Sequence, residues 1–201
     1  MKRHEIKYRD SIGNLSTFEK FLILNGFRKH FPCREICSLY FETNNLLFYI
    51  NAEEGITPRK KVRIRTYNAN FSGPDFYQEE KRTLHSYKTK TSKKISLQQL
   101  NQYISGGLLD KSSGLLTPNV FVTYNRLYFY NQALNIRVTL DFDIRYRQRY
   151  TESHFKEPDF YIIEVKTDAI QPIEVVHNIF GISNLRFSKY CEAVKRLRVF
   201  K

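Results

Sequence analysis

Charged and apolar side chains alternate along several short stretches of this 201-residue chain. Arg63 and Arg65, for example, fall on one side of an extended strand, while Ile64 falls on the other. A period of two residues is typical of β-strands, because successive side chains of a strand point to opposite faces. The pattern therefore predicts a protein made mainly of strands. The stretches that show it are 3–8, 38–44, 61–67, 76–82, 120–129, 136–143 and 161–167.

Four other segments have the spacing of helices: 16–27, 96–107, 172–181 and 188–200. Ser16 and Glu19 have the spacing of a capping box, and Ser188 stands where an N-cap is expected. Strands dominate and the helices are segregated, which favours an α+β fold with an antiparallel sheet. No linker divides the chain, so residues 1–201 are expected to form a single domain.

The chain is strongly basic, with 33 Lys and Arg against 20 Asp and Glu and a net charge of +13. This excess favours a polyanionic partner: nucleic acid, an anionic membrane or a phosphate-rich small molecule. The charged N-terminus and the lack of a long apolar run predict a soluble, cytoplasmic protein without a membrane segment. Cys33, Cys37 and Cys191 are expected to be reduced thiols and not zinc ligands.

The same charged mixture recurs on strand after strand: Arg or Lys at alternating positions, a Glu two residues from a Lys, and Tyr close by. On a single strand this would indicate a sheet with one face in water. Its recurrence favours a closed barrel with cations inside, because alternate residues of barrel strands point inward. Carboxylates on the same faces would compensate part of the charge: Glu5, Glu79, Asp141 and Glu164.

Eight short motifs follow one another along the chain. They are R-x-E-x-K-Y at 3–8, S-x-Y-F-E-T at 38–43, K-x-R-x-R-x-Y at 61–67, E-x-K at 79–81, Y-x-R at 124–126, R-V-T-L-D at 137–141, E-V-K at 164–166 and R-F-S-K-Y at 186–190. Their order resembles the VTC domain of the vacuolar transporter chaperone family, among the triphosphate tunnel metalloenzymes, and the compact chain resembles its free-standing bacterial members. The resemblance implies an antiparallel β-tunnel of about eight strands with flanking helices.

The resemblance also implies which residues would form the site. Seven cations would be catalytic: Lys7, Arg63, Arg65, Lys81, Arg126, Arg137 and Lys189. They would also contact phosphate, together with Arg186, with Lys93 or Lys94, and with the hydrogen-bonding Tyr124 and Ser188. Glu164 matches the glutamate of the family that binds Mn²⁺ or Mg²⁺.

The activity that this family implies is transfer of the γ-phosphate of ATP to a growing polyphosphate chain. Rivals of the same fold are an inorganic or nucleoside triphosphatase and a non-catalytic polyphosphate or nucleotide sensor. Arg3 stands where many tunnel enzymes have a first glutamate, which disfavours hydrolysis with two metals. A nucleic-acid-binding β-domain is the distant alternative, disfavoured by glutamates that would repel a nucleic-acid backbone.

Overall fold

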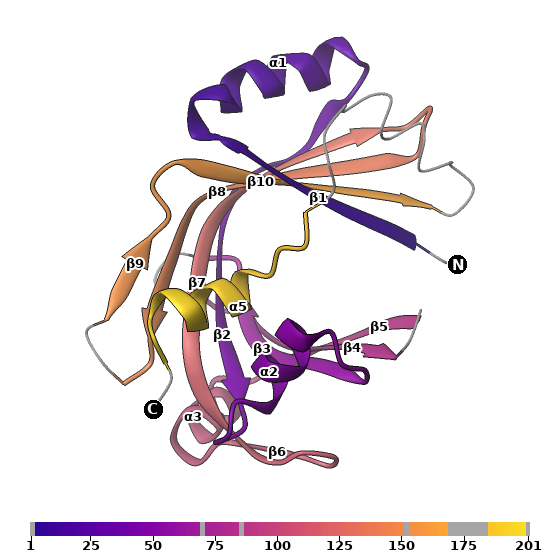
Figure 1. Ribbon diagram of the computed structural model, residues 1–201. Coiled ribbons are helices and arrows are strands. Elements are labelled where there is room, and N and C mark those ends of the chain that lie inside the picture. The colour runs from indigo at the N-terminus through magenta and orange to yellow at the C-terminus, as the bar shows by residue number, and fades with distance from the viewer. Residues whose placement is uncertain (1–2, 69–70, 85–86, 151–152, 169–184, 200–201) are drawn as a thin grey trace. The chain divides into compact units, whose positions relative to one another are not determined.

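The computed structural model describes residues 3–68, 71–84, 87–150, 153–168 and 185–199 (Figure 1). Within these ranges, ten strands form an antiparallel sheet in the order β1-β10-β8-β7-β2-β3-β4-β5, with β6 beside β7 and β9 beside β8. The strands are β1 (Arg3–Ser11), β2 (Arg28–Glu42), β3 (Arg59–Thr66), β4 (Phe76–Leu84), β5 (Tyr87–Ile95), β6 (Leu108–Asp110), β7 (Gly114–Asn131), β8 (Ile136–Gln148), β9 (His154–Lys156) and β10 (Phe160–Asp168).

The described helices are α1 (Leu15–Leu24), α2 (Leu47–Glu54), α3 (Leu97–Gly106) and α5 (Lys189–Arg196), with a 3₁₀ turn at Ile12–Asn14. The predicted fold class, an α+β antiparallel sheet, is confirmed. The sheet has ten strands in place of about eight, and the described strand path is open, because β1 and β5 stand at its two ends. No helix within the described ranges is long and apolar enough to cross a membrane.

All seven stretches of alternating residues coincide with strands, although 38–44 and 61–67 extend one or two residues beyond the ends of β2 and β3. Strands β5, β6 and β9 and helix α2 were not predicted. In β5, eight of the nine residues are exposed, so the strand has no apolar face to reveal it in the sequence.

The start of α2 depends on a residue outside the helix. The buried carboxylate of Glu42 accepts hydrogen bonds from the backbone N–H groups of Phe48 (3.0 Å) and Tyr49 (2.9 Å). These groups have no partner within a helix, so a carboxylate stabilises its first turn.

The capping prediction at Ser16 was wrong, because α1 begins at Leu15 with Asn14 as its N-cap. A capping box is present instead on α3, where Ser96 and Gln99 exchange hydrogen bonds with each other's backbone N–H groups. The N-cap at Ser188 is confirmed, since its hydroxyl accepts the backbone N–H of Cys191. The predicted helix at 172–181 lies outside the described residues.

The chain consists of two compact units, which are described separately. Unit 1 comprises residues 1–34, 124–144 and 156–187, and unit 2 comprises residues 35–123, 145–155 and 188–201.

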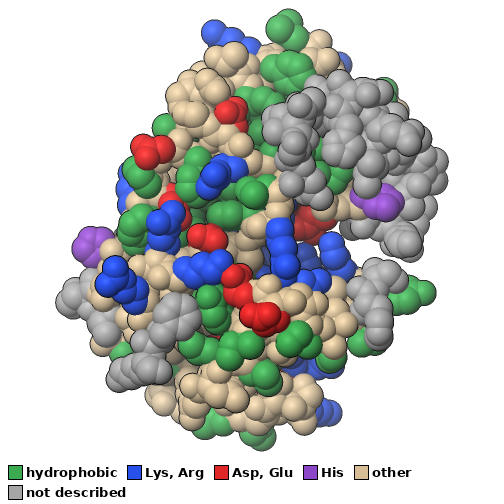
Figure 2. All heavy atoms as spheres, in the orientation of Figure 1, with side chains coloured by type: hydrophobic (Ala, Val, Ile, Leu, Met, Phe, Trp, Pro, Cys, Tyr) green, Lys and Arg blue, Asp and Glu red, His purple; other side chains and the backbone are tan. Residues whose placement is uncertain are grey.

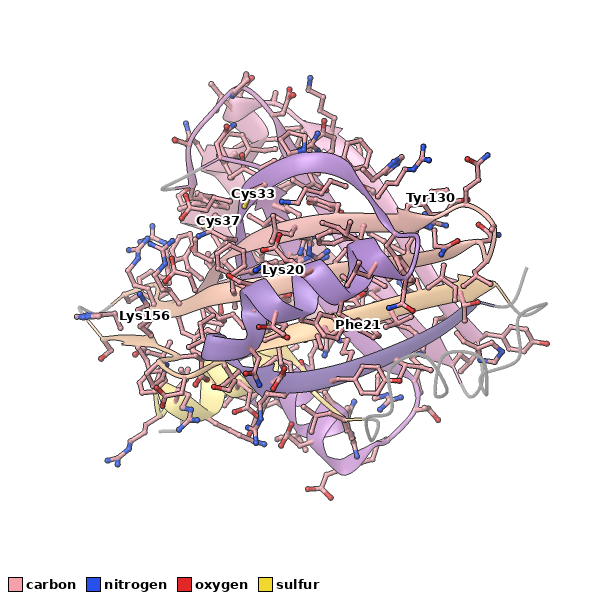
Figure 3. The ribbon with its side chains drawn as sticks, turned by 90° about the horizontal axis from the view of Figure 1, so that it is seen from above. Lys20, Phe21, Cys33, Cys37, Tyr130 and Lys156 are labelled. Carbon is pink, nitrogen blue, oxygen red and sulfur yellow. The ribbon has the colours of Figure 1, made fainter. Side chains whose placement is uncertain are left out.

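In unit 1, α1 packs on one face of the sheet (Figure 3). Leu22 of this helix is completely buried among Tyr8, Leu140, Ile163 and other apolar side chains of the strands. Since side chains alternate along a strand, the residues between these core positions must lie on the opposite face. That opposite face carries the charges of unit 1.

In unit 2, the apolar face of β2 and β3 packs with α3. Leu39, Val62 and Ile64 form a buried cluster with Leu100 of the helix and Phe121 of β7. The face on the other side of these strands again carries the polar positions, and α5 contributes a tyrosine to it. Each unit thus has one apolar face covered by a helix and one charged face.

Two neighbouring leucines of α1 test this packing. Leu22 is fully buried and Leu24 is 86% exposed. Leu22→Ala should lower the free energy of unfolding by about 2–5 kcal/mol, because it leaves a cavity in the core. The control Leu24→Ala should change it by less than about 0.5 kcal/mol. Urea unfolding measures both, and equal effects would contradict the described placement of α1.

Candidate functional site

The charged face of unit 2 is built from rows of residues that lie opposite one another across neighbouring strands. One row joins Lys61, Lys81 and Lys90 across β3, β4 and β5. The other two rows are Tyr40, Arg63, Glu79, Ser92 and Ser38, Arg65, Tyr77, Lys94. We call these three rows the basic face of unit 2.

Glu79 is the negative centre of the basic face and is only 3% exposed. Its Oε2 accepts two hydrogen bonds from Arg63, from Nε at 2.8 Å and Nη2 at 2.6 Å. Its Oε1 accepts Lys90 Nζ at 2.6 Å, and Arg65 Nη1 lies 3.8 Å from Oε2. Burial would raise the pKa of Glu79, but Arg63, Arg65 and Lys90 together lower it to about 2. The carboxylate therefore stays ionised and holds the guanidinium of Arg63 in place.

Tyr40 lies beside Arg63, whose Nη1 donates to the phenol oxygen at 2.8 Å. Burial would raise the pKa of Tyr40, yet the charges of Arg63, Arg65 and Lys61 and this hydrogen bond lower it to about 8. A buried phenol with such a low pKa reports a strongly positive local potential.

The start of α5 adjoins the basic face. The ring of Tyr190 stacks on that of Tyr40 with centroids 5.0 Å apart, and its hydroxyl donates to Glu42. Lys61 Nζ donates to Ser188 Oγ at 2.7 Å. The N-terminus of α5, where backbone N–H groups favour anions, therefore lies beside a lysine of the basic face.

The charged face of unit 1 mixes cations with carboxylates. Across β1, β10 and β8, the register places Lys7 opposite Glu164 and Glu164 opposite Thr139. Arg126 donates to both oxygens of the buried Asp141, with Nη2 2.7 Å from Oδ2, and lies 3.6 Å from Glu164. Figure 2 shows such mixing on the surface of the molecule, where Lys and Arg side chains lie beside Asp and Glu side chains.

The carboxylates of this face hold its cations in their charged form. Burial would lower the pKa of Lys7, but Glu164, Glu5 and Asp141 raise it above its usual value. The same effect raises the pKa of Arg126 well above the usual value, despite burial, chiefly through Asp141. Lys7 Nζ also donates to the backbone carbonyl of Phe187 at 3.1 Å. We call Glu5, Lys7, Tyr124, Arg126, Asp141 and Glu164 the charged face of unit 1.

The structure brings together most of the residues that the sequence singled out. The charged face of unit 1 contains four of them: Lys7, Tyr124, Arg126 and Glu164. The basic face of unit 2 contains four more, Arg63, Arg65, Lys81 and Lys94, and Ser188 adjoins it through Lys61. Their roles toward phosphate stay predictions.

Four of the predicted residues lie outside these groups or at their margins. Lys93 faces away from the basic face, because it lies opposite Gln78 on the apolar side of β4. Arg137 lies opposite Lys166 on the charged side of β8 but is exposed. Arg186 is exposed just before α5, and Lys189 is the half-buried first residue of that helix.

Sequence reasoning missed Tyr40, Lys61, Lys90 and Tyr190 as members of the site. Tyr40 and Lys61 stand inside motifs that were recognised, and alternation alone places Lys61 on the side of Arg63. The position of Lys90 depends on the register of β5, which the sequence did not reveal. Only the fold brings Tyr190 to Tyr40, across 150 positions of the chain.

The described residues contain no group of three His, Cys, Asp or Glu side chains that could hold a metal ion, and the three cysteines are free thiols. Mg²⁺ is commonly bound by one or two carboxylates together with oxygens of the substrate phosphates. Glu164, with one oxygen 2.7 Å from Lys166 and the other facing Arg126, fits that mode. It could hold Mg²⁺ or Mn²⁺ jointly with a phosphate chain.

Glu79→Gln tests the charge balance of the basic face. The carboxylate contributes stability above pH 4.5, its usual pKa, and loses it as the pH falls toward 2. The free energy of unfolding of the variant should therefore be about 3 kcal/mol lower than that of the wild type at pH 7. This difference should shrink toward pH 3. Denaturant unfolding across this range, with the exposed Glu54→Gln as control, measures it. A difference that does not vary with pH would contradict the described network.

Comparison with known proteins agrees with this fold. A candidate adenylate cyclase from Vibrio parahaemolyticus, solved by X-ray crystallography, has a TM-score of 0.58 and 14% identity over 97% of this chain and 98% of its own. A second candidate adenylate cyclase, from Bacillus halodurans, has a TM-score of 0.55 and 16% identity over 94% of this chain and 96% of its own. No curated protein matches the chain. The model of the VTC domain matches residues 14–198, and the chain therefore belongs to the VTC domain family.

Proposed function

We propose that residues 1–201 act as one polyphosphate polymerase domain, which transfers the γ-phosphate of ATP to a growing polyphosphate chain. The observation that carries the proposal is the bracing of half-buried arginines by buried carboxylates on both charged faces, in a chain of the VTC domain family. A braced guanidinium loses little conformational freedom when an anion binds, so its hydrogen bonds contribute more to affinity.

The register of the basic face favours an extended anion as the ligand. Lys61, Lys81 and Lys90 lie directly opposite one another on three neighbouring strands. Like charges in such positions destabilise a sheet. A phosphate chain lying across the row would relieve this repulsion, since each of its units carries negative charge.

Phosphoryl transfer to a polyphosphate chain needs little acid–base catalysis by the protein. The attacking oxygen of a polyphosphate end is already ionised, so the cations need only position both substrates and neutralise charge in the transition state. Lys7 and Arg126 would do so on the charged face of unit 1, and Arg63 and Arg65 would bind phosphate on the basic face of unit 2. A divalent cation bound at Glu164 would supply further positive charge on the phosphates.

The names of the solved structures that share this fold favour a nucleoside triphosphate as a substrate. Both solved structures that share it are named as candidate adenylate cyclases, an activity whose substrate is ATP by definition. A triphosphatase or a sensor built on the same faces would bind the same anions. The reaction products distinguish these functions: a ladder of lengthening chains for a polymerase, released phosphate for a hydrolase, and neither for a sensor.

Tyr40 provides a direct measure of anion binding at the basic face. Tripolyphosphate would add negative charge beside the phenol and should raise its pKa from about 8 by about one unit or more. Titration of the phenol by ultraviolet absorbance, with Tyr40→Phe to identify its contribution, measures the shift. A pKa that tripolyphosphate leaves unchanged, relative to chloride at equal ionic strength, would argue against phosphate at this face.

Two substitutions separate catalysis from binding. Glu164→Gln should reduce chain extension by about 100-fold or more, because it removes the charge that holds the metal. Its binding of tripolyphosphate without metal should stay equal or tighten. Arg65→Ala should instead weaken that binding by ~1.5–3 kcal/mol, the contribution of a hydrogen bond to a charged group.

The assay contains ATP, Mn²⁺ and a short polyphosphate primer, with gel electrophoresis for the products and calorimetry for binding. Glu54→Gln, on the exposed side of α2, serves as the matched carboxylate control. An unchanged dependence on Mn²⁺ in Glu164→Gln would remove this residue from the metal site. Absence of a product ladder from the wild-type protein would refute the polymerase.

A further inference from the structure

Five side chains of unit 1 form an aromatic cluster on β2 and β7: His30, Phe31, Arg34, Tyr128 and Tyr130. The ring of Phe31 meets that of Tyr128 edge to face at 5.5 Å, and His30 contacts Phe31 at 4.2 Å and Tyr130 at 5.8 Å. The guanidinium of Arg34 lies 4.9 Å from the centre of Phe31 and 5.9 Å from that of Tyr128. The cluster thus combines π faces with a planar cation.

Two members of the cluster, Tyr128 and Tyr130, lie on the side of β7 that carries the charged face of unit 1. Leu127 and Phe129 point into the core under α1, so Tyr128 and Tyr130 must lie on the opposite side of β7, the side of Arg126. Tyr128 is two residues from Arg126 and Tyr130 is four, or about 7 and 13 Å along the strand. Tyr130 lies near the end of β7 (Figure 3).

The rings remain accessible although they contact one another. Phe31 is 43% exposed, which is unusual for a phenylalanine within a long strand. The ladder between β2 and β3 covers Cys37–Phe41, so the stretch that contains Phe31 lies beyond it. Residues 28–34 include Arg28, Lys29 and Arg34 but no acidic residue, although Lys29 is paired with Glu19 of α1 at 3.1 Å. Arg34, which lies beside the rings of Phe31 and Tyr128, would therefore attract an anionic ligand to the cluster.

We propose that the aromatic cluster binds the base of the nucleoside triphosphate whose phosphates lie at Arg126 and Lys7. This inference rests on the proposed function. In a nucleoside triphosphate, the ribose and the inner phosphates lie between the base and the terminal phosphate. The aromatic cluster likewise lies some distance along the strand from Arg126, so the base and the phosphates could bind at these two places. Aromatic rings and guanidinium planes stack on any base, so the subsite should bind adenine and guanine nucleotides alike.

The test compares ATP with tripolyphosphate, which has the phosphates but no base. Calorimetry without divalent cations, which prevents turnover, gives both dissociation constants. Phe31→Ala should raise the dissociation constant of ATP about 5- to 100-fold and leave that of tripolyphosphate within about twofold, because stacking on a base is lost. Phe31→Leu, which keeps an apolar side chain without a π face, should behave in the same way. The control Tyr87→Ala removes a 75% exposed aromatic ring from unit 2 and should change neither constant.

The outcomes separate this inference from the function on which it rests. If the wild-type protein binds neither ligand, both are overturned. If it binds both, and Phe31→Ala leaves both constants unchanged or weakens them equally, only the base subsite is overturned. The subsite is also overturned if Phe31→Ala abolishes binding of a single-stranded oligonucleotide and leaves ATP binding intact.

Discussion

The pairing of buried carboxylates with cations is the interaction on which both charged faces depend. Arginines and lysines placed on neighbouring strands repel one another, and their burial removes the water that would screen them. Glu79 offsets this repulsion in unit 2, and Asp141 and Glu164 offset it in unit 1. Because the carboxylates are fewer than the cations around Glu79, the face stays positive while its side chains stay ordered.

The same interaction joins the charged faces to the fold. Glu42 accepts hydrogen bonds from backbone N–H groups of α2 and from the hydroxyl of Tyr190. The ring of Tyr190 stacks on Tyr40 of the basic face. Lys61 contacts the N-cap of α5 through Ser188. Helices α2 and α5 are therefore positioned by polar residues of β2 and β3. A substitution that moves either helix should also shift side chains of the basic face.

Much of the fold could be predicted because alternation is a local property. Whenever Val62 and Ile64 face the core, Arg63 must face the other way, and no knowledge of partner strands is needed. Elements without an apolar face, such as β5, leave no such signal. The cap of α2 by Glu42 joins residues that only the folded strand brings into position.

The candidate site was predictable to the same extent. The motifs identified which strands carry the cations, and alternation gave their side, but the sequence could not choose between Lys93 and Lys94. That choice depends on the register between β4 and β5, which places Lys94 opposite Tyr77 and Lys93 opposite Gln78. The aromatic cluster was hidden for a similar reason, since Phe31 and Tyr128 belong to strands distant in sequence.

Strand β5 ends the described strand path, and this position has a consequence for self-association. A strand at the edge of a sheet offers backbone groups to which another chain can add, and such addition begins aggregation. Lys88, Lys90, Lys93 and Lys94 are all exposed on this strand. A second copy pairing there would bring its own lysines against them, so the lysines of β5, among them Lys90 and Lys94 of the basic face, also discourage the sheet from growing between molecules.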